Sequence, residues 1–276
     1  MAEINSADVV KLRKSTGAGM MDCKKALQEA NGNFEQAVEI IRKKGQLVAS
    51  KRADREANEG VVLAKVSSDM KTGVIIVLNC ETDFVAKNQS FISFAESVLD
   101  LALTKLPSNL EELKKLEMGG KTVADAVTHQ VGKIGEKIDL SFYEKLSAAH
   151  VISYIHPGNK LASLAGFNKV HSNPQVGKDV AMQVAAMDPV AVDKNQIPRH
   201  ILDKEMEIGK DQARREGKPE EIVEKIALGK LNKFYKEKTL LNQEFIKDNK
   251  KTILQYLQEN DKELTVTGFV RYGLKD

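Results

Sequence analysis

The chain runs from Val74-Ile75-Ile76-Val77-Leu78-Asn79-Cys80 straight into Glu81-Thr82-Asp83-Phe84-Val85-Ala86-Lys87-Asn88. The first run is apolar and rich in β-branched residues, which predicts a buried strand. An amphipathic pattern begins near Ser90 and predicts a helix. Thr82 lies between them and is a suitable helix N-cap. The segment therefore predicts a strand-to-helix junction.

The adjacent side chains of Asp83 and Phe84 allow two interpretations. In the first, Phe84 belongs to the core and Asp83 merely favours a helix N-terminus. In the second, both side chains project from the fold, so that the ring fills a pocket on a partner and the carboxylate competes for a charged group there. Spacing alone favours the first interpretation and leaves the second open.

Composition predicts a water-soluble protein with a substantial core. The chain has 276 residues, of which 42% are hydrophobic and 29% charged, and this length predicts about two domains. No apolar run approaches the roughly 20 residues that span a bilayer, and the N-terminus lacks the pattern of a signal peptide. We therefore expect a cytoplasmic protein with no membrane partner.

Cysteine and histidine usage argues against a metal site. Cys23 and Cys80 lie far apart in the sequence, and the five histidines show no metal-ligand spacing with them. We expect both thiols to be reduced, buried and inert, and we expect no metal and no cofactor.

The net charge of +3 is concentrated near the N-terminus. Residues 1–58 hold 11 Lys and Arg against 8 Asp and Glu, a balance of +3, so residues 59–276 balance at 31 against 31. This excess would assist encounter with an acidic surface. A solvated helix face gives the same pattern and is the simpler explanation.

The first 45 residues predict a unit of three helices with a minimal core. Ser15-Thr16-Gly17-Ala18-Gly19 breaks the first helix, and Met20, Cys23 and Leu27 form one stripe of the second. We expect Gly45 to end the third helix. Residues 46–59 then predict a helical or flexible tether. Such a unit is better suited to display a surface than to house a catalytic site.

The next part of the chain contains the same order of elements twice, a β-hairpin followed by helix. Val61–Val66 and Val74–Cys80 predict a β-hairpin that is followed by helices over 91–105, 110–116 and 122–134. A second hairpin, with strands over 150–155 and 160–168, precedes a helix over 176–187. The matching order predicts two related α+β subdomains packed together.

Residues 197–238 predict an antiparallel helical hairpin around Gly217-Lys218-Pro219. It either protrudes or folds back on the body, and the pattern alone favours neither. A helix over 252–257 and a strand over 264–272 follow, and that strand would complete the second sheet.

The predicted fold class is therefore α+β, with a three-helix N-terminal module, a two-part core of β-hairpins with packed helices, and an inserted antiparallel helical hairpin. The predicted domain boundaries are 1–55 for the module and tether, 56–140 for the first subdomain, 141–196 with 239–276 for the second, and 197–238 for the insertion.

The sequence contains no convincing active site. It has no phosphate-binding loop, dinucleotide fingerprint or nucleophile elbow. Thr16-Gly17-Ala18-Gly19 would offer backbone amides to an anion, but the strand that usually precedes such loops is missing, which favours a plain turn. Nothing near Cys80 lowers a thiol pKa, and His156 beside Pro157-Gly158 is most simply a hairpin tip. These absences favour a protein that acts by binding and is not an enzyme.

Nucleic-acid binding is a weaker alternative. Aromatic content is 5%, tryptophan is absent, and basic and aromatic residues do not interleave, so no base-stacking platform is expected. A ribosome- or RNA-associated binding protein that uses the basic N-terminal module stays open as a second hypothesis.

Two separate stretches closely resemble the signatures of one family. These are Leu12-Arg13-Lys14-Ser15-Thr16-Gly17-Ala18-Gly19-Met20-Met21-Asp22-Cys23-Lys24-Lys25-Ala26-Leu27 and Asn79-Cys80-Glu81-Thr82-Asp83-Phe84-Val85-Ala86-Lys87-Asn88. Both are similar to bacterial translation elongation factor Ts, in the same order. The resemblance extends through Gly217-Lys218-Pro219, Leu241-Asn242-Gln243 and Thr267-Gly268-Phe269-Val270-Arg271-Tyr272.

This resemblance implies a guanine-nucleotide exchange factor for the GTPase elongation factor Tu. It further implies a ubiquitin-associated-like N-terminal module, a two-part core and a protruding antiparallel helical hairpin. It also favours the projecting interpretation of Asp83 and Phe84, and it implies no direct nucleic-acid partner. The residues that it assigns to partner binding are Leu12, Met20, Met21 and Lys24 against the nucleotide domain; Thr82, Asp83, Phe84 and Val85 near the magnesium site; and His156 against the other domains.

The sequence departs from the family pattern in two places. Gln243-Glu244-Phe245 stands where the family often has Gln-Pro-Phe. Many members also extend past the last strand into a small helical module, and we expect its contacts to be absent or replaced in this chain. Self-association through the helical hairpin varies among members, so a homodimer within the complex stays open.

Overall fold

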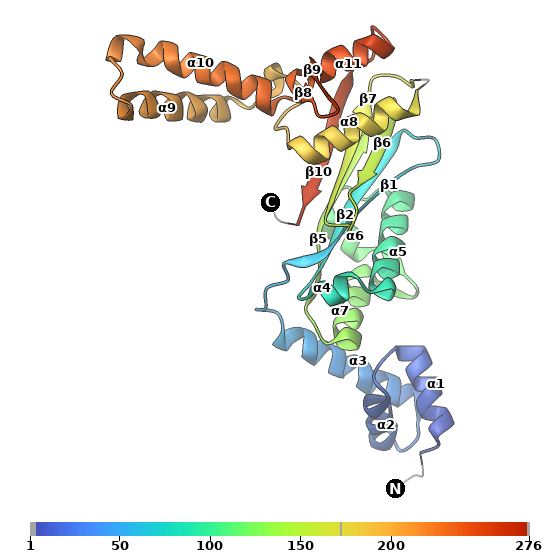
Figure 1. Ribbon diagram of the computed structural model, residues 1–276. Helices are drawn as coiled ribbons and strands as arrows, with labels where there is room; N and C mark the ends of the chain where they lie inside the picture. The colour runs from blue at the N-terminus through green and yellow to red at the C-terminus, as the bar shows by residue number, and fades with distance from the viewer. Residues whose placement is uncertain (1–3, 172, 275–276) are drawn as a thin grey trace.

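The computed structural model describes residues 4–171 and 173–274 (Figure 1). It combines helices with small antiparallel sheets, so the predicted α+β class is confirmed. The molecule is elongated, with a helical module at the N-terminal end, two sheets with their helices in the middle, and a helical arm at the far end (Figure 1).

The N-terminal module consists of α1 (Ser6–Thr16), α2 (Met20–Glu29) and α3 (Phe34–Lys51). Cys23 and Leu27 are buried in its core as the stripe predicted, but Met20 is 41% exposed. Met20 is the first residue of α2, where the helix has just left the loop, and its side chain lies beside the core rather than within it.

Gly45 does not end α3, which continues for six more residues to Lys51. Gly45 is buried at the crossing between α3 and α7 (Val123–Ile134), where the two backbones touch. A Cβ built on Gly132 of α7 would lie only 2.6 Å from the Gly45 Cα. Gly45 therefore permits a close helix contact and is not a terminator. Residues 46–59 were predicted to be a helical or flexible tether, and the helical form is confirmed as far as Lys51.

The first sheet is antiparallel in the order β1-β2-β5, from β1 (Glu59–Val66), β2 (Thr72–Cys80) and β5 (Ile138–Ser147). Between β2 and β5 the chain forms α4 (Asp83–Ala86), α5 (Gln89–Lys105), α6 (Leu110–Lys115), the short strands β3 (Glu117–Met118) and β4 (Lys121–Thr122), and α7.

Strand β5 was not predicted, and the predicted boundary between residues 140 and 141 falls inside it. A register shift explains the failure, because Val77 pairs with Phe142 whereas Leu78 pairs with Leu140. Ser141 is the extra residue of this bulge, and it interrupts the period-two alternation that reveals a strand. The first subdomain therefore extends at least to Ser147.

The second sheet is antiparallel in the order β10-β7-β6, from β6 (His150–Ile155), β7 (Leu161–Phe167) and β10 (Val266–Gly273). The predicted return of a distant strand to this sheet is confirmed. Helices α8 (Pro174–Met187) and α11 (Ile253–Asn260), the 3-10 turns Lys194–Gln196 and Leu240–Asn242, and the strands β8 (Glu244–Phe245) and β9 (Asp248–Thr252) complete the subdomain.

The two sheets pack face to face. Alternate residues of β1, such as Val62 and Ala64, contact Val151 and Leu164 of the second sheet. The other face of the first sheet is covered by α5, α6 and α7, and the other face of the second sheet is covered by α8 and α11. The central strands β2 and β7 are thus buried on both faces, which explains their nearly continuous apolar runs, whereas the edge strands β5 and β10 also carry polar residues.

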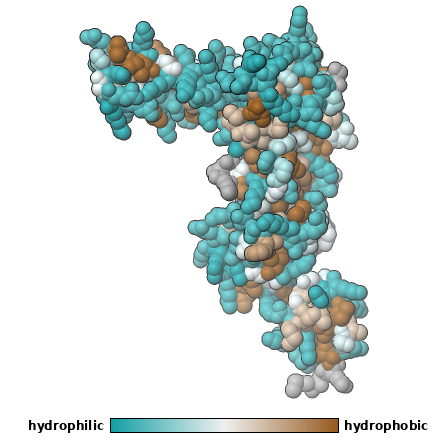
Figure 2. All heavy atoms as spheres, in the orientation of Figure 1, coloured by the Kyte–Doolittle hydropathy of each residue, from teal (hydrophilic) through white to brown (hydrophobic). Residues whose placement is uncertain are grey.

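Helices α9 (Arg199–Arg215) and α10 (Glu220–Lys238) form the predicted antiparallel hairpin. The hairpin protrudes from the body (Figure 1), and its visible surface is mostly hydrophilic (Figure 2). Its own narrow core holds it together, because Gly209 allows the Ala227 backbone to approach and Ala213 and Val223 are buried. The alternative in which it folds back on the body is wrong.

We expect Gly132→Ala to lower the free energy of unfolding by about 1–3 kcal/mol, the usual cost of overpacking. The new methyl group would press against the Gly45 backbone. Gly45→Ala is the matched control, since its Cβ would meet the Gly132 Cα at an ordinary 3.5 Å and alanine favours helix by about 1 kcal/mol. Urea unfolding followed by circular dichroism measures both, and equal destabilisation would refute the contact.

Two histidine rings contact each other at a tilted angle inside the second subdomain. His150 is 6% exposed, and its ring centroid lies 4.7 Å from that of His171, which also contacts Phe167 at 4.9 Å. The Nδ1 atom of His150 and both ring nitrogens of His171 are buried without a hydrogen-bond partner among the described residues. Burial lowers the pKa of both rings, and the charge of His150 lowers that of His171 further.

This pair predicts acid sensitivity. In the unfolded chain the histidines take up protons below about pH 6.5, whereas in the folded protein they do so only at lower pH. The unfolded state then holds more protons, so stability falls as pH drops from about 6.5. Thermal melts at pH 7.5 and pH 5.5 should show a smaller loss for His171→Phe than for the parent. An equal loss in both proteins would contradict this role.

Candidate partner-binding site

Residues 81–88 form a rigid tip, which we call the α4 tip, at one end of the first sheet. Thr82 caps the four-residue α4, since its Oγ1 accepts a hydrogen bond from the Val85 N–H. The chain turns again at Asn88, which caps α5 through the Ser90 N–H at 2.9 Å. The predicted N-cap at Thr82 is confirmed, but the helix that it starts is a single turn separate from α5.

A reciprocal pair of carboxylates anchors the α4 tip. Glu136, just beyond α7, accepts hydrogen bonds from the Thr82 backbone N–H at 3.0 Å and from the Thr82 hydroxyl at 2.7 Å. In return, Glu81 accepts one from the backbone N–H of Lys137 at 2.5 Å. We call this arrangement the Glu81–Glu136 clamp. Each segment therefore binds the other through a charged acceptor, which makes a stronger hydrogen bond than a neutral one.

The clamp also reaches the tether that leads to the N-terminal module. Arg52 forms an ion pair with Glu81 at 2.7 Å, and the backbone N–H of Lys137 and this guanidinium together hold the pKa of the Glu81 carboxyl below its usual value. The Lys137 ammonium donates to the carbonyls of Ala53 and Arg55 at 2.7 and 2.8 Å. The tether is thus tied to the same end of the sheet as the α4 tip.

The side chains of the α4 tip divide into an inner and an outer set. Ala86 is buried and Val85 is half-buried against the core of the first subdomain. Phe84 is 84% exposed. The interpretation that placed Phe84 in the core is therefore wrong, and the ring projects from the fold. A large exposed ring on a rigid support is typical of a binding surface.

Asp83 lies beside the ring and is charged at neutral pH. Lys87, one turn later, donates a hydrogen bond to its carboxylate at 2.6 Å. This bond is the main cause that lowers the pKa of Asp83, and the positive charges of Lys87 and Lys160 add to it. The pair is solvent-exposed, so a partner cation can compete for the carboxylate at small cost.

Cys80 lies directly behind the tip and is buried. Its thiol donates to the Thr82 carbonyl at 3.1 Å. Burial and the neighbouring carboxylates of Glu136 and Glu59 raise the pKa of the Cys80 thiol to about 12. The thiol is therefore protonated at neutral pH and is a poor nucleophile, which removes the support for a thiol enzyme.

His156 is exposed at the turn between β6 and β7, as expected of a hairpin tip. The Tyr154 hydroxyl and the His156 Nδ1 are hydrogen-bonded at 2.9 Å. The same turn contacts the start of β1, because Lys160 pairs with Glu59 at 2.6 Å and Glu59 lies opposite Cys80 in the sheet. His156 and the α4 tip therefore lie at the same end of the core.

In the N-terminal module, three of the four candidate residues lie on the surface. Met21 is 64% exposed, and Met20 and Lys24 are also exposed on the first turns of α2. Leu12 has 0% exposure and packs inside the module. Direct contact between Leu12 and a partner does not fit this position; its side chain supports the helix that carries the two methionines.

The sequence did not identify the residues that position the tip. Glu136 and Arg52 are distant from Thr82 along the chain, and both sit in charged stretches that resemble any solvated surface. Within residues 4–171 and 173–274 no three His, Cys, Asp or Glu residues are placed to hold a metal. In the same residues, no helix combines the length and apolarity needed to cross a membrane.

A comparison with known families shows which family the chain belongs to. A family model described as elongation factor TS matches residues 81–276, which is more than half of the chain and begins at the α4 tip. The chain belongs to the elongation factor Ts family.

Relatives in the elongation factor Ts family also cover the N-terminal module. The elongation factor Ts of Porphyromonas gingivalis is 53% identical over 268 residues, 97% of each chain. Those of Christiangramia forsetii and Chloroherpeton thalassium are 51% and 47% identical, covering 99% of this chain and 100% and 99% of their own. The resemblance found in the sequence is confirmed, and the protein is a translation elongation factor of protein biosynthesis.

We expect Thr82→Ala to lower the free energy of unfolding by about 1–2 kcal/mol, because it removes the cap of α4 and one partner of Glu136. Phe84→Ala should change it by less than about 0.5 kcal/mol, since the ring is exposed. Urea unfolding measures both. A large loss for Phe84→Ala would show that the ring has a structural role.

Proposed function

We propose that the chain is a guanine-nucleotide exchange factor that promotes GDP release from elongation factor Tu by perturbing its magnesium and phosphate site. The observation that carries this proposal is the pairing of an 84% exposed Phe84 with the Asp83 carboxylate on a clamped tip. Membership in the elongation factor Ts family supports the choice of partner. The protein acts by binding and catalyses no chemical step of its own.

Exchange of this kind is a linkage between two ligands of the GTPase. The factor binds the nucleotide-free GTPase more tightly than the loaded one, so the factor and the nucleotide weaken each other's binding equally. Typical couplings of about 1–3 kcal/mol correspond to about 5- to 150-fold changes in affinity. Useful acceleration of release calls for several contacts that act together.

Phe84 supplies the wedge in this proposal. Full burial of a phenylalanine side chain stabilises a contact by about 1.5–3 kcal/mol, and nearly all of that area is still exposed in the free protein. The Glu81–Glu136 clamp holds the tip in place before binding. Little conformational entropy is then lost on docking, and more of the burial energy can displace a loop of the GTPase.

Asp83 supplies the charge. Its carboxylate is an oxygen donor of the kind that magnesium and its water ligands accept. Brought near the metal, it competes with the diphosphate and weakens the bridge that the metal forms. The exposed ion pair between Asp83 and Lys87 must break for this to happen.

Two further surfaces complete the proposed interface. Met20, Met21 and Lys24 of the N-terminal module bind the nucleotide domain of the GTPase, and the His156 turn grips its other domains. We further propose that the complex forms in the cytoplasm, and that the α9–α10 arm is the element through which any second copy would join.

The test is the rate at which elongation factor Tu releases a fluorescent GDP analogue. The double variant Asp83→Ala/Phe84→Ala should slow the accelerated release at least tenfold, because it removes both the wedge and the charge. Val170→Ala is the control, since Val170 is also a strongly exposed apolar side chain but lies in the second subdomain after β7. If the double variant accelerates release as well as the parent, the wedge mechanism is wrong.

A further inference from the structure

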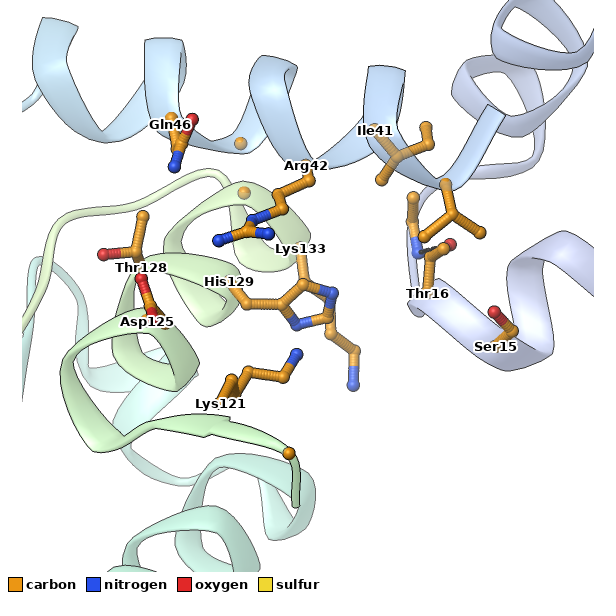
Figure 3. A pocket seen from close by; sticks show the side chains of 15 residues that line it. Ser15, Thr16, Ile41, Arg42, Gln46, Lys121, Asp125, Thr128, His129 and Lys133 are labelled. Atoms are coloured by element: carbon orange, nitrogen blue, oxygen red, sulfur yellow. Dashed lines mark hydrogen bonds between the residues drawn. The ribbon is translucent and has the colours of Figure 1, made fainter. Parts of the chain in front are cut away.

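A cavity of about 300 Å³ lies at the junction between the N-terminal module and the core (Figure 3). Its walls come from the end of α1 and the loop after it, from α3, from the β3–β4 turn and from α7. This volume is at the lower end of the range for small-molecule sites. None of the residues discussed above as partner-binding lines it.

Three cationic side chains from three different elements line this cavity. Arg42 comes from α3, Lys121 from β4 and Lys133 from α7, and Figure 3 shows them around the same space. Within residues 4–171 and 173–274, none of the three forms an ion pair with a carboxylate, although, after the hydrogen bond from Lys43, the charge of Arg42 helps to lower the pKa of Glu39 one turn away on α3. Elsewhere on α3 the lysines are paired, Lys43 with Glu39 at 2.9 Å and Lys44 with Asp22.

Asp125 is the acidic residue among the lining side chains. Its carboxylate accepts a hydrogen bond from the Thr122 hydroxyl at 2.9 Å at the start of α7. One carboxylate against three cations leaves a net charge of about +2. Such a concentration of one sign in a concave site attracts anions.

His129 of α7 adds a ring to the same space (Figure 3). Burial and the positive charges of Lys121 and Lys133 lower its pKa, while a hydrogen bond with the Thr16 backbone acts in the opposite direction. The ring is therefore neutral at neutral pH and offers a flat, weakly polar face. Val38, Ile41 and Ala18 provide apolar wall on the side of the N-terminal module.

We propose that this cavity binds a phosphate-bearing small molecule of up to mononucleotide size. Arg42, Lys121 and Lys133 hold the phosphate groups, because guanidinium and ammonium groups are the usual phosphate ligands. The apolar part of the ligand lies against His129, Ile41 and Val38. The last turn of α1 contributes the Ser15 hydroxyl.

Ligand binding at this place joins two parts of the chain. Arg42 belongs to the N-terminal module, whereas Lys121 and Lys133 belong to the first subdomain. A bound phosphate neutralises charges on both sides and links them. It therefore fixes the module against the core and raises the thermal midpoint of the folded protein. This proposal is independent of nucleotide exchange on the GTPase.

The test uses the full chain at low ionic strength with pyrophosphate, ADP and GDP as separate probes. Calorimetry gives the affinity, and proton NMR of the imidazole gives the pKa of His129. We expect a bound probe to raise that pKa, because the anion cancels the lysine charges that lower it. The two nucleotides should bind more tightly than pyrophosphate if the apolar wall contributes.

The variants Lys121→Gln and Lys133→Gln should each weaken binding about tenfold, the usual effect of losing one charged hydrogen bond. Lys178→Gln on α8 removes an exposed lysine far from the cavity and should leave the affinity unchanged. Unmoved His129 resonances with every probe would overturn the proposal. So would equal affinity of the Lys121→Gln/Lys133→Gln double variant and the parent.

Discussion

The geometry of the candidate site depends on reciprocal hydrogen bonds, in which each of two neighbouring loops supplies a carboxylate that accepts from the other. Glu136 holds the backbone and hydroxyl of Thr82, and Glu81 holds the backbone of Lys137 and the side chain of Arg52. A one-turn helix such as α4 is not stable in water by itself. The clamp fixes its start, and burial of Ala86 fixes its end. The aromatic ring between these two anchors is therefore held outward.

The clamp can exist only because the end of β2 lies beside the start of β5. Cys80 pairs with Ile138 across the sheet, which places the two loops side by side. The sheet is in turn fixed by burial on both faces, against helices on one side and against the second sheet on the other. A stiff double layer thus carries the α4 tip and the His156 turn at one end. The proposed interface needs both to keep a constant spacing.

Much of the fold could be predicted from the sequence, because apolar residues follow the periods of strands and helices. The strands β1, β2, β6, β7 and β10 and the long helices have continuous apolar runs or clear helical stripes. The failures occurred where tertiary contacts decide. The bulge at Ser141 hid β5, and Gly45 looked like a terminator although it serves a helix crossing.

The candidate site, too, contains residues that the sequence pattern identifies and residues that only tertiary contacts identify. The motif itself named Thr82 to Val85, but periodicity alone placed Phe84 in the core, since an exposed and a buried phenylalanine have the same sequence signal. Family resemblance corrected that choice. It also assigned Leu12 to the interface, although Leu12 is buried. Residues such as Glu136 and Lys160 could not be found because their roles arise only when distant loops meet.

The crossing of α3 over α7 has a consequence for how such proteins diverge. A Cβ on Gly132 would lie 2.6 Å from the Gly45 Cα, whereas a Cβ on Gly45 would lie an ordinary 3.5 Å from the Gly132 Cα, so the position on α7 is the restrictive one. A larger residue on α7 must be matched by a shift of the whole N-terminal module. Recombining the module of one relative with the core of another would therefore succeed only when the parent that supplies the core keeps a glycine at the position of Gly132.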